Sequence, residues 1–336
     1  MNRRDILWTG MAAIAVAVAG FGFGAPALGQ DKMVLKAADV WPVGYPTVDA
    51  VLGIGKKLEA ATKGRLSVQM FPSMQLGGEK EMIEQAQVGA LQFARISVGP
   101  MGPIVDELNV FNMPFVFRDV PHMNKVIDGD IGQELLDKLS NAPASKLIGL
   151  CWMDAGARSF YNSKKPIKTI DDLKGLKIRM MGNPIFVDTA NALGANGIAM
   201  GFDQLVSALQ TGVVDGAENN PPSYETGKHY QFAKYYSLSE HLIIPEILVF
   251  SKVTWDKLSK DDQAMIKKFS KEAQLEERKL WNVKEAGSLA ELKKNGIEIV
   301  TFSPAEKAKF QAAVKPVWDK YGAKYTALVK RIQDVK

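Results

Sequence analysis

The stretch GLKIRMMGNPIFVDTANALGANGIAMGFDQLVSALQTGVVDGAENNPPS, from Gly175 to Ser223, decides the fold. Residues 176–180 alternate apolar and basic side chains, which is typical of a strand. Residues 197–200 form a short apolar run, and we expect a third strand at 216–219. The intervals between these strands are long enough for helices, so the stretch predicts strands that alternate with helices.

Helix signals fill both intervals. Asn183 and Pro184 match the N-cap and first position of one helix, and Gly194 matches the residue just past its end. We expect Asp203 to cap the second helix and Gly212 to end it. Strands that alternate with helices predict an α/β fold with parallel sheets covered on both faces.

Arg179 is the most informative residue of this stretch because it stands at the carboxyl end of a predicted strand. Ligands of open α/β sheets bind at the carboxyl ends of the strands. A guanidinium there offers a rigid fork that fits a carboxylate with two parallel hydrogen bonds. An arginine that pairs with a surface acid is the alternative, and chemistry alone leaves both open.

Two motifs carry a resemblance to a known family. The run DLKGLKIRM (172–180), followed by GVVDGAEN (212–219), resembles the substrate-binding proteins of TRAP transporters, the DctP type. The resemblance implies that Arg179 clamps the carboxylate of the ligand and that Asn219 supports it. It covers nearly the whole chain after the N-terminal segment. Where Asn-Pro is usual after the glutamate, this sequence has Asn219-Asn220-Pro221, which leaves open which asparagine faces the cleft.

A second arginine belongs to the same candidate site. The resemblance implies that Arg158, in the run DAGAR, reaches the ligand carboxylate or a neighbouring hydroxyl. The alternative is an ion pair between Arg158 and Glu218 or Asp154. Asn183 and Glu218 complete the ligand-binding candidates that this half of the chain supplies.

The other half of the chain offers polar and aromatic candidates. Trp41 and Tyr45 follow the first predicted strand, and an aromatic face packs well on the apolar side of a sugar ring. Glu79 starts a predicted helix and is expected to accept hydrogen bonds from ligand hydroxyls. Its alternative role is an acid at a positive helix end. Ser97 ends a predicted strand and is the last candidate.

The N-terminal segment is typical of a secretory signal. Arg3 and Arg4 precede the apolar run 11–23, and small residues at 27–29 fit a cleavage site. We therefore expect residues 1–29 to be a signal peptide and the mature protein to be periplasmic. The general secretory and twin-arginine routes both remain open, and a retained membrane anchor is the alternative.

Composition excludes several classes of function. The net charge of +5 comes without a basic block, so we expect no nucleic-acid partner. Cys151 is the only cysteine, which rules out an intrachain disulfide, and it is expected to be buried. His122, His229 and His241 lack metal-ligand spacing, so we expect no metal, no cofactor and no catalytic histidine.

Two series of strands and helices predict two lobes with a ligand cleft between them, as in periplasmic binding proteins. We expect one lobe to comprise 30–154 plus about 245–283, and the other 155–244 plus about 284–336. The segment from 259 to about 295 predicts a helix of roughly 54 Å, which must run across both lobes. The resemblance implies the same feature.

These observations predict a solute receptor rather than an enzyme. The expected ligand is a small, hydroxyl-rich monoacid such as a uronate or an aldonate, delivered by a monomer to the permease of a TRAP transporter. A C4-dicarboxylate would need a second cation, for which Arg95 and Arg118 are available, and an aromatic or keto acid is the third choice. A periplasmic enzyme acting on an organic acid, or a purely structural protein, is the alternative class.

Overall fold

A computed structural model describes residues 32–336 of the chain. The expected signal peptide at 1–29 lies outside the described residues. Within 32–336, no helix combines the length and the apolar character needed to cross a membrane. Residues 32–336 form one compact unit, built on two sheets.

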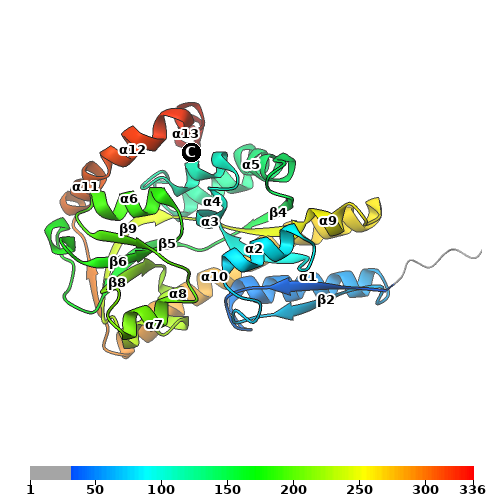
Figure 1. Ribbon diagram of the computed structural model, residues 1–336, viewed down its shortest axis with the longest axis horizontal. Coiled ribbons are helices and arrows are strands. Elements are labelled where there is room, and N and C mark those ends of the chain that lie inside the picture. Colours follow the sequence, from blue (N-terminus) through cyan, green and yellow to red (C-terminus); the bar gives the residue numbers. More distant parts are fainter. Residues whose placement is uncertain (1–31) are drawn as a thin grey trace, which may run out of the picture. The chain divides into compact units, whose positions relative to one another are not determined.

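The first sheet has five strands in the order β2-β1-β3-β10-β4. Strands β1, β2 and β3 are parallel, whereas β10 is antiparallel to both β3 and β4. We call this sheet and its helices the five-stranded half (Figure 1). Its strands are β1 (Met33–Ala38), β2 (Leu66–Phe71), β3 (Phe93–Ser97), β4 (Leu147–Met153) and β10 (Glu246–Ser251).

The second sheet has six strands in the order β11-β9-β5-β8-β6-β7. Strand β5 is antiparallel to both of its neighbours, while β6 is parallel to β7 and to β8. We call this sheet and its helices the six-stranded half. Its strands are β5 (Ala157–Asn162), β6 (Lys177–Met180), β7 (Asn196–Ala199), β8 (Gly216–Asn219), β9 (Tyr235–Ile243) and β11 (Glu298–Thr301).

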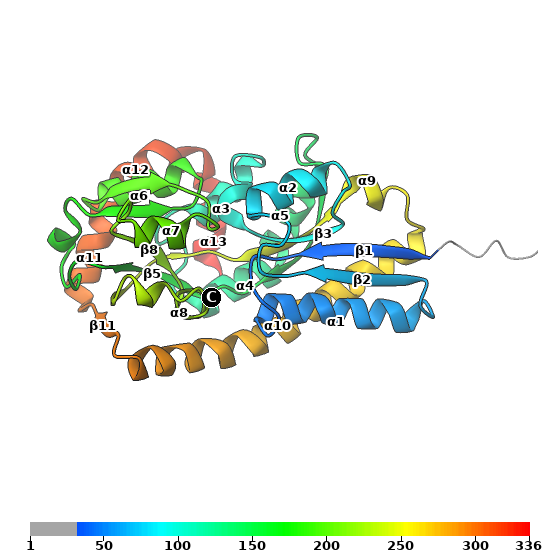
Figure 2. The same ribbon diagram turned by 60° about the horizontal axis from the view of Figure 1, so that its bottom comes forward.

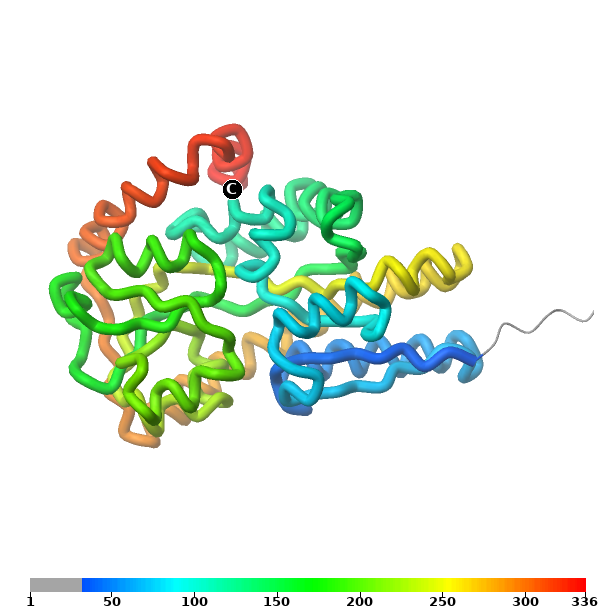
Figure 3. The backbone as a smooth tube through the Cα atoms, in the orientation of Figure 1, coloured from blue at the N-terminus to red at the C-terminus, as the bar shows by residue number. Residues whose placement is uncertain are grey.

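Both sheets are mixed, so the expectation of parallel sheets was wrong. The reason is that the chain passes between the halves twice without a helix, from β4 to β5 and from β9 to β10. The two crossings can be followed in green and yellow in Figure 3. A strand that enters its sheet from the other half, rather than through a covering helix, runs against its neighbours.

The helices cover the sheets and cap the ends of the strands. Four 3-10 turns, at Asp106–Asn112, Ile170–Leu173, His229–Gln231 and Gly322–Tyr325, complete the secondary structure of residues 32–336. The α-helices are α1 (Pro46–Ala61), α2 (Glu79–Gln87), α3 (Val98–Met101), α4 (Val120–Asp128), α5 (Asp130–Asn141), α6 (Pro184–Ala192), α7 (Leu205–Gln210), α8 (Pro221–Thr226), α9 (Lys252–Trp255), α10 (Lys260–Lys294), α11 (Pro304–Ala313), α12 (Lys315–Tyr321) and α13 (Thr326–Asp334).

Capping residues start most of the helices that the sequence predicts. Asn183 is the N-cap of α6, and its side chain accepts a hydrogen bond from the backbone nitrogen of Ile185. The expected cap at Asp203 was wrong: the N-cap of α7 is Gln204, and it makes no side-chain cap. Asp203 instead reaches toward α2 of the other half, where its carboxylate lies against Gly78.

Helix α10 joins the two halves. Its 35 residues correspond to a length of about 52 Å. It packs on α1 and β4 of the five-stranded half and on α8 of the six-stranded half. Figure 2 shows it running beneath both halves, which confirms the predicted long helix.

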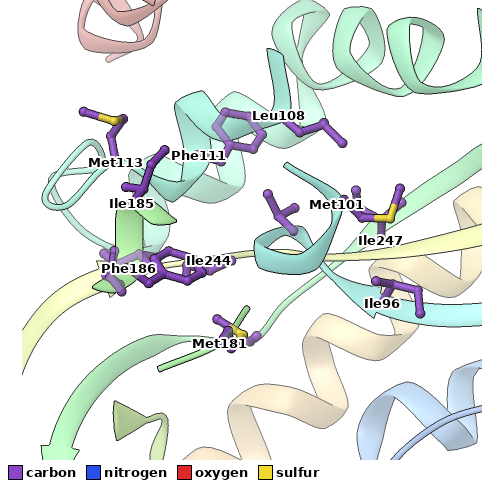
Figure 4. Packing of buried hydrophobic residues seen from close by; sticks show 14 of the residues in the cluster. Ile96, Met101, Leu108, Phe111, Met113, Met181, Ile185, Phe186, Ile244 and Ile247 are labelled. Carbon is purple, nitrogen blue, oxygen red and sulfur yellow. The ribbon is translucent and has the colours of Figure 1, made fainter. Parts of the chain in front are cut away.

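Part of the hydrophobic core is shared between the halves. Figure 4 shows three residues of one buried cluster: Ile96 of β3, Met181, which follows β6 directly, and Phe186 of α6. Gly99 packs so closely on this cluster that a methyl group there would lie 2.6 Å from the Phe186 ring. The halves are therefore packed against each other around the crossing strands. The exact lobe boundaries given above stay a prediction.

Candidate functional site

A cavity of about 690 Å³ lies where the strand ends of the two sheets face each other. The five-stranded half contributes the ends of β1 and β3 and the start of the antiparallel β10. The six-stranded half contributes β6, the end of β8 and the start of the antiparallel β5. The lining includes six residues predicted from the sequence, namely Trp41, Glu79, Ser97, Arg158, Arg179 and Asn219.

Arg179, on β6, is a buried cation of this cavity that has no carboxylate partner among the described residues. Its side chain is held by a hydrogen bond of 2.9 Å from Nε to the carbonyl oxygen of Met200. Its guanidinium also lies over the Phe202 ring, 5.9 Å from the ring centroid. Burial lowers the pKa of Arg179, because the charged form has lost its water. An arginine nevertheless stays protonated, so the cavity holds an uncompensated positive charge.

Arg158, on β5, is neutralised by the protein. Its Nε and Nη2 donate to the two carboxylate oxygens of Glu218 at 2.7 and 2.8 Å. Its Nη1 donates to Oδ1 of Asn219 at 2.7 Å. Burial opposes the charge on Arg158, but the Glu218 carboxylate outweighs it and raises the pKa. The ion pair with Glu218, which the sequence left open as an alternative, is therefore present. Arg158 also lines the cavity.

Arg95, on β3, is surrounded by three carboxylates. Its Nη2 and Nε donate to Oδ1 of Asp39 at 2.5 and 3.1 Å. Its Nη1 donates to Glu79 at 2.6 Å and to Glu246 at 2.8 Å. Both Asp39 and Arg95 are almost completely buried. One guanidinium thus serves three acids, and this side of the cavity carries an excess of negative charge.

An aromatic wall connects the two halves beside the cavity. The Trp41 ring stacks on Tyr45 with a centroid distance of 4.5 Å and meets Phe202 edge-on at 4.9 Å. The Tyr45 hydroxyl and the Ser223 hydroxyl are 3.2 Å apart, which joins the loop after β1 to α8. Tyr45 is 2% exposed and lies behind Trp41, outside the lining.

Two further candidates also lie outside the lining. Glu218 is fully buried beneath Arg158. The Asn183 amide donates to the carbonyl oxygen of Gly99 and to Oδ1 of Asn109, both at 2.9 Å, and so ties α6 to the other half. Both residues therefore hold other parts of the cavity wall in place and do not themselves line the cavity.

The two asparagines that the sequence left open have separate places. Asn219 lines the cavity, whereas Asn220 is the N-cap of α8 and accepts from the backbone nitrogen of Ser223. Oδ1 of Asn219 accepts from Arg158 and from the backbone nitrogen of Asn220. Its amide nitrogen has no partner among the described residues, so it is available to a ligand.

Sequence reasoning missed Asp39, Glu246 and Phe202. Glu246 opens strand β10 ahead of the apolar run 247–250, and only an antiparallel β10 brings it opposite Ser97. Asp39 follows β1 directly, which was a usable signal because the carboxyl ends of parallel strands face ligands. Phe202 stands in the loop after β7, and it lines the cavity beside Arg179.

The described residues hold no group of three or more His, Cys, Asp or Glu side chains arranged to bind a metal. The three histidines, at positions 122, 229 and 241, are buried and lie outside the cavity lining. Cys151 is completely buried on β4, as predicted.

Two α/β halves around a cavity, joined by crossing strands and one long helix, define a solute-binding protein. The chain belongs to the bacterial extracellular solute-binding protein family 7, the DctP family, which matches residues 37–324. This confirms the resemblance to the receptors of TRAP transporters.

Curated relatives cover most of the chain. A solute-binding protein of Chromohalobacter salexigens is 37% identical and covers 89% of each chain. The C4-dicarboxylate-binding periplasmic protein DctP of Rhodobacter capsulatus is 30% identical and covers 98% of each chain.

Solved structures match more closely. A TRAP periplasmic solute-binding protein of Pseudomonas putida F1 with bound D-glucuronate is 53% identical, with a TM-score of 0.88 over 90% of this chain and 98% of that one. One from Bradyrhizobium with bound galacturonate is 45% identical, with a TM-score of 0.86 over 90% and 100%.

A protein of Citrobacter koseri has been solved in two states. Its D-glucuronate complex is 47% identical to this chain, with a TM-score of 0.88 over 90% of this chain and 100% of that one. Its open form without ligand gives a TM-score of 0.78 at 44% identity, over 90% and 98%. The present structure is thus more similar to the liganded arrangement, in agreement with the contacts that Tyr45 and Trp41 make across the cavity.

Proposed function

We propose that this protein captures a hexuronate, D-glucuronate or D-galacturonate, in the periplasm and delivers it unchanged to the permease of a TRAP transporter. The single observation that carries the proposal is Arg179, a buried cation that lines the cavity and has no carboxylate partner in residues 32–336. The carboxylate of the ligand is the partner that Arg179 lacks.

Arg179 is suited to this role by its fixed position. Its Nε is engaged by Met200, which leaves both terminal nitrogens for two parallel hydrogen bonds to one carboxylate. Arg158 and the amide of Asn219 add donors beside it. Hydrogen bonds to charged groups contribute about 1.5–3 kcal/mol each, so a micromolar complex, at about −8 kcal/mol, needs only a few of them.

The charges favour an acid with one carboxylate. Arg95, considered above as a second clamp, is already bound to three carboxylates. Arg118 donates to the carbonyl oxygens of Gln333 and Val335 and does not line the cavity. The uronates bound in related structures that are 45–53% identical support the same choice.

The proposed role is binding, without turnover. The cavity lining contains no histidine or cysteine, and residues 32–336 hold no metal-binding group of side chains. Trp41 offers a ring face for the apolar side of a pyranose, which is a binding contact. Family membership supports a TRAP permease as the partner and the periplasm as the location. We propose a monomer.

Isothermal titration calorimetry tests the proposal. Purified mature protein is titrated with D-glucuronate, D-galacturonate, an aldonate and succinate, and a hexuronate is expected to bind at micromolar Kd or tighter. Arg179→Ala should abolish binding. The matched control is Arg331→Ala, which removes a guanidinium from an exposed ion pair on α13 and should leave Kd unchanged.

Three results would contradict the proposal. Unchanged affinity in Arg179→Ala would contradict the role of Arg179 in binding the carboxylate. Binding of succinate in preference to both hexuronates would contradict the proposed class of ligand. If chromatography shows that the acid is consumed during incubation with the protein, the protein is an enzyme instead.

A further inference from the structure

We infer that Glu79, Glu246 and Ser97 form a hydroxyl-binding pole that determines specificity: it accepts a hydroxylated, uncharged end of the ligand and rejects a second carboxylate. The inference rests on the proposed function, because it concerns the end of the ligand that faces away from Arg179. All three residues line the cavity from the five-stranded half. They come from α2, from the start of β10 and from the end of β3.

The charge of the pole is the first step. Arg95 is the cation that holds these acids in place, and it is shared by Asp39, Glu79 and Glu246. Asp39 uses both of its oxygens inside the protein, because Oδ1 accepts from Arg95 and Oδ2 accepts from Thr47 at 2.6 Å. The charge of Arg95 is therefore already compensated by carboxylates of the protein. A second carboxylate of the ligand would meet an excess of negative charge at this pole.

The free acceptors of the pole are the second step. Glu79 places Oε1 on Arg95 and on the backbone nitrogen of Ser97, at 2.6 and 3.1 Å. Glu246 places Oε2 on Arg95 at 2.8 Å. The other oxygen of each carboxyl group has no protein partner in residues 32–336. Both residues line the cavity, so these oxygens are positioned to accept hydrogen bonds from sugar hydroxyls.

The Ser97 hydroxyl is an independent observation that points to a ligand. Ser97 is 3% exposed, and its Oγ has no hydrogen-bond partner within the described chain. A buried hydroxyl without a partner is costly, and such groups are rare in folded proteins. Ser97 stands at the end of β3 in the cavity wall, so a ligand hydroxyl is the partner that satisfies it.

The two sides of the cavity thus have opposite character. The six-stranded half offers the unpaired cation Arg179, and the five-stranded half offers free carboxylate oxygens and one hydroxyl. A hydroxylated monoacid satisfies both sides at once. A diacid of the same length satisfies Arg179 but places its second carboxylate against Glu79 and Glu246, where like charges repel.

Removing one charge from the pole tests this inference. Kd is measured at pH 8 for D-glucuronate and for D-glucarate, which carries a carboxylate at both ends, in the wild type and in Glu79→Gln. The readout is the ratio of Kd for glucarate to Kd for glucuronate. Any effect of ligand shape is common to both proteins and cancels when the two ratios are compared.

In Glu79→Gln the ratio should fall at least about tenfold, because the amide removes a negative charge close to the second carboxylate. The control is Glu59→Gln, which removes an exposed charge on α1 outside the cavity and should leave the ratio within about twofold. An unchanged ratio in Glu79→Gln overturns the inference.

Ser97→Ala supplies a second test that does not depend on charge. Its hydroxyl has no protein partner, so the melting temperature without ligand should not fall, while Kd for glucuronate should rise several-fold. Unchanged Kd in this variant contradicts the role of Ser97. Tight binding of glucarate by the wild type overturns the hydroxyl-binding pole but is compatible with the proposed receptor function. Absence of binding to any hexuronate contradicts the proposed receptor function itself.

Discussion

Glu246→Gln should remove a specific part of the pH dependence of folding stability. Burial raises the pKa of Glu246 from 4.5 to about 7, and Glu79 adds to the rise while Arg95 and Arg158 oppose it. The buried carboxyl of Glu277, on α10, also interacts with Glu246.

The sign follows from which state binds the proton more tightly. The folded protein has the higher pKa for Glu246, so it holds this proton up to about pH 7, whereas the unfolded chain releases it near pH 4.5. The stabilisation is complete below pH 4.5 and is lost as the pH rises to about 7. The rise of the pKa from 4.5 to about 7, at 1.36 kcal/mol per pH unit, gives a loss of about 3 kcal/mol.

Urea unfolding at a series of pH values between 4.5 and 8 measures this loss. The difference in unfolding free energy between the wild type and Glu246→Gln isolates Glu246, because all other titrating groups are common to both proteins. The wild type should lose about 3 kcal/mol more than the variant across this range. Glu59→Gln, which removes an exposed acid, should follow the wild type. Parallel curves for the wild type and Glu246→Gln would refute the reasoning.

Three further outcomes follow from buried contacts. Tyr45→Phe removes the hydrogen bond to Ser223 across the cavity and should weaken ligand binding by about 1 kcal/mol in calorimetry; no change means the bond does not support closure. Glu218→Ala leaves Arg158 buried without its acid and should cost about 3–5 kcal/mol in urea unfolding, a loss below 1 kcal/mol being inconsistent with the pair. Burial raises the pKa of the Cys151 thiol, so it should react with Ellman's reagent only after unfolding; reaction in the native state contradicts its position.

The sequence by itself determined the local structure and the chemistry at strand ends. Ser259 caps α10 and Ser303 caps α11, because a cap is a hydrogen bond between residues three apart. Strand β3 ends at Ser97 as predicted, and Arg179 lies on β6 within a cavity. Short-range periodicity and capping are complete within a few residues, so a single segment contains the information.

Only the tertiary structure decided which charges remain available to a ligand. Arg95 and Arg179 have the same side chain and both lie on strands, but Arg95 is bound by Asp39 and Glu246, which are 56 and 151 residues away. That pairing depends on the antiparallel entry of β10 beside β3. The sequence contains no local signal for it, because the order of strands in a sheet is set by the packing of the whole chain.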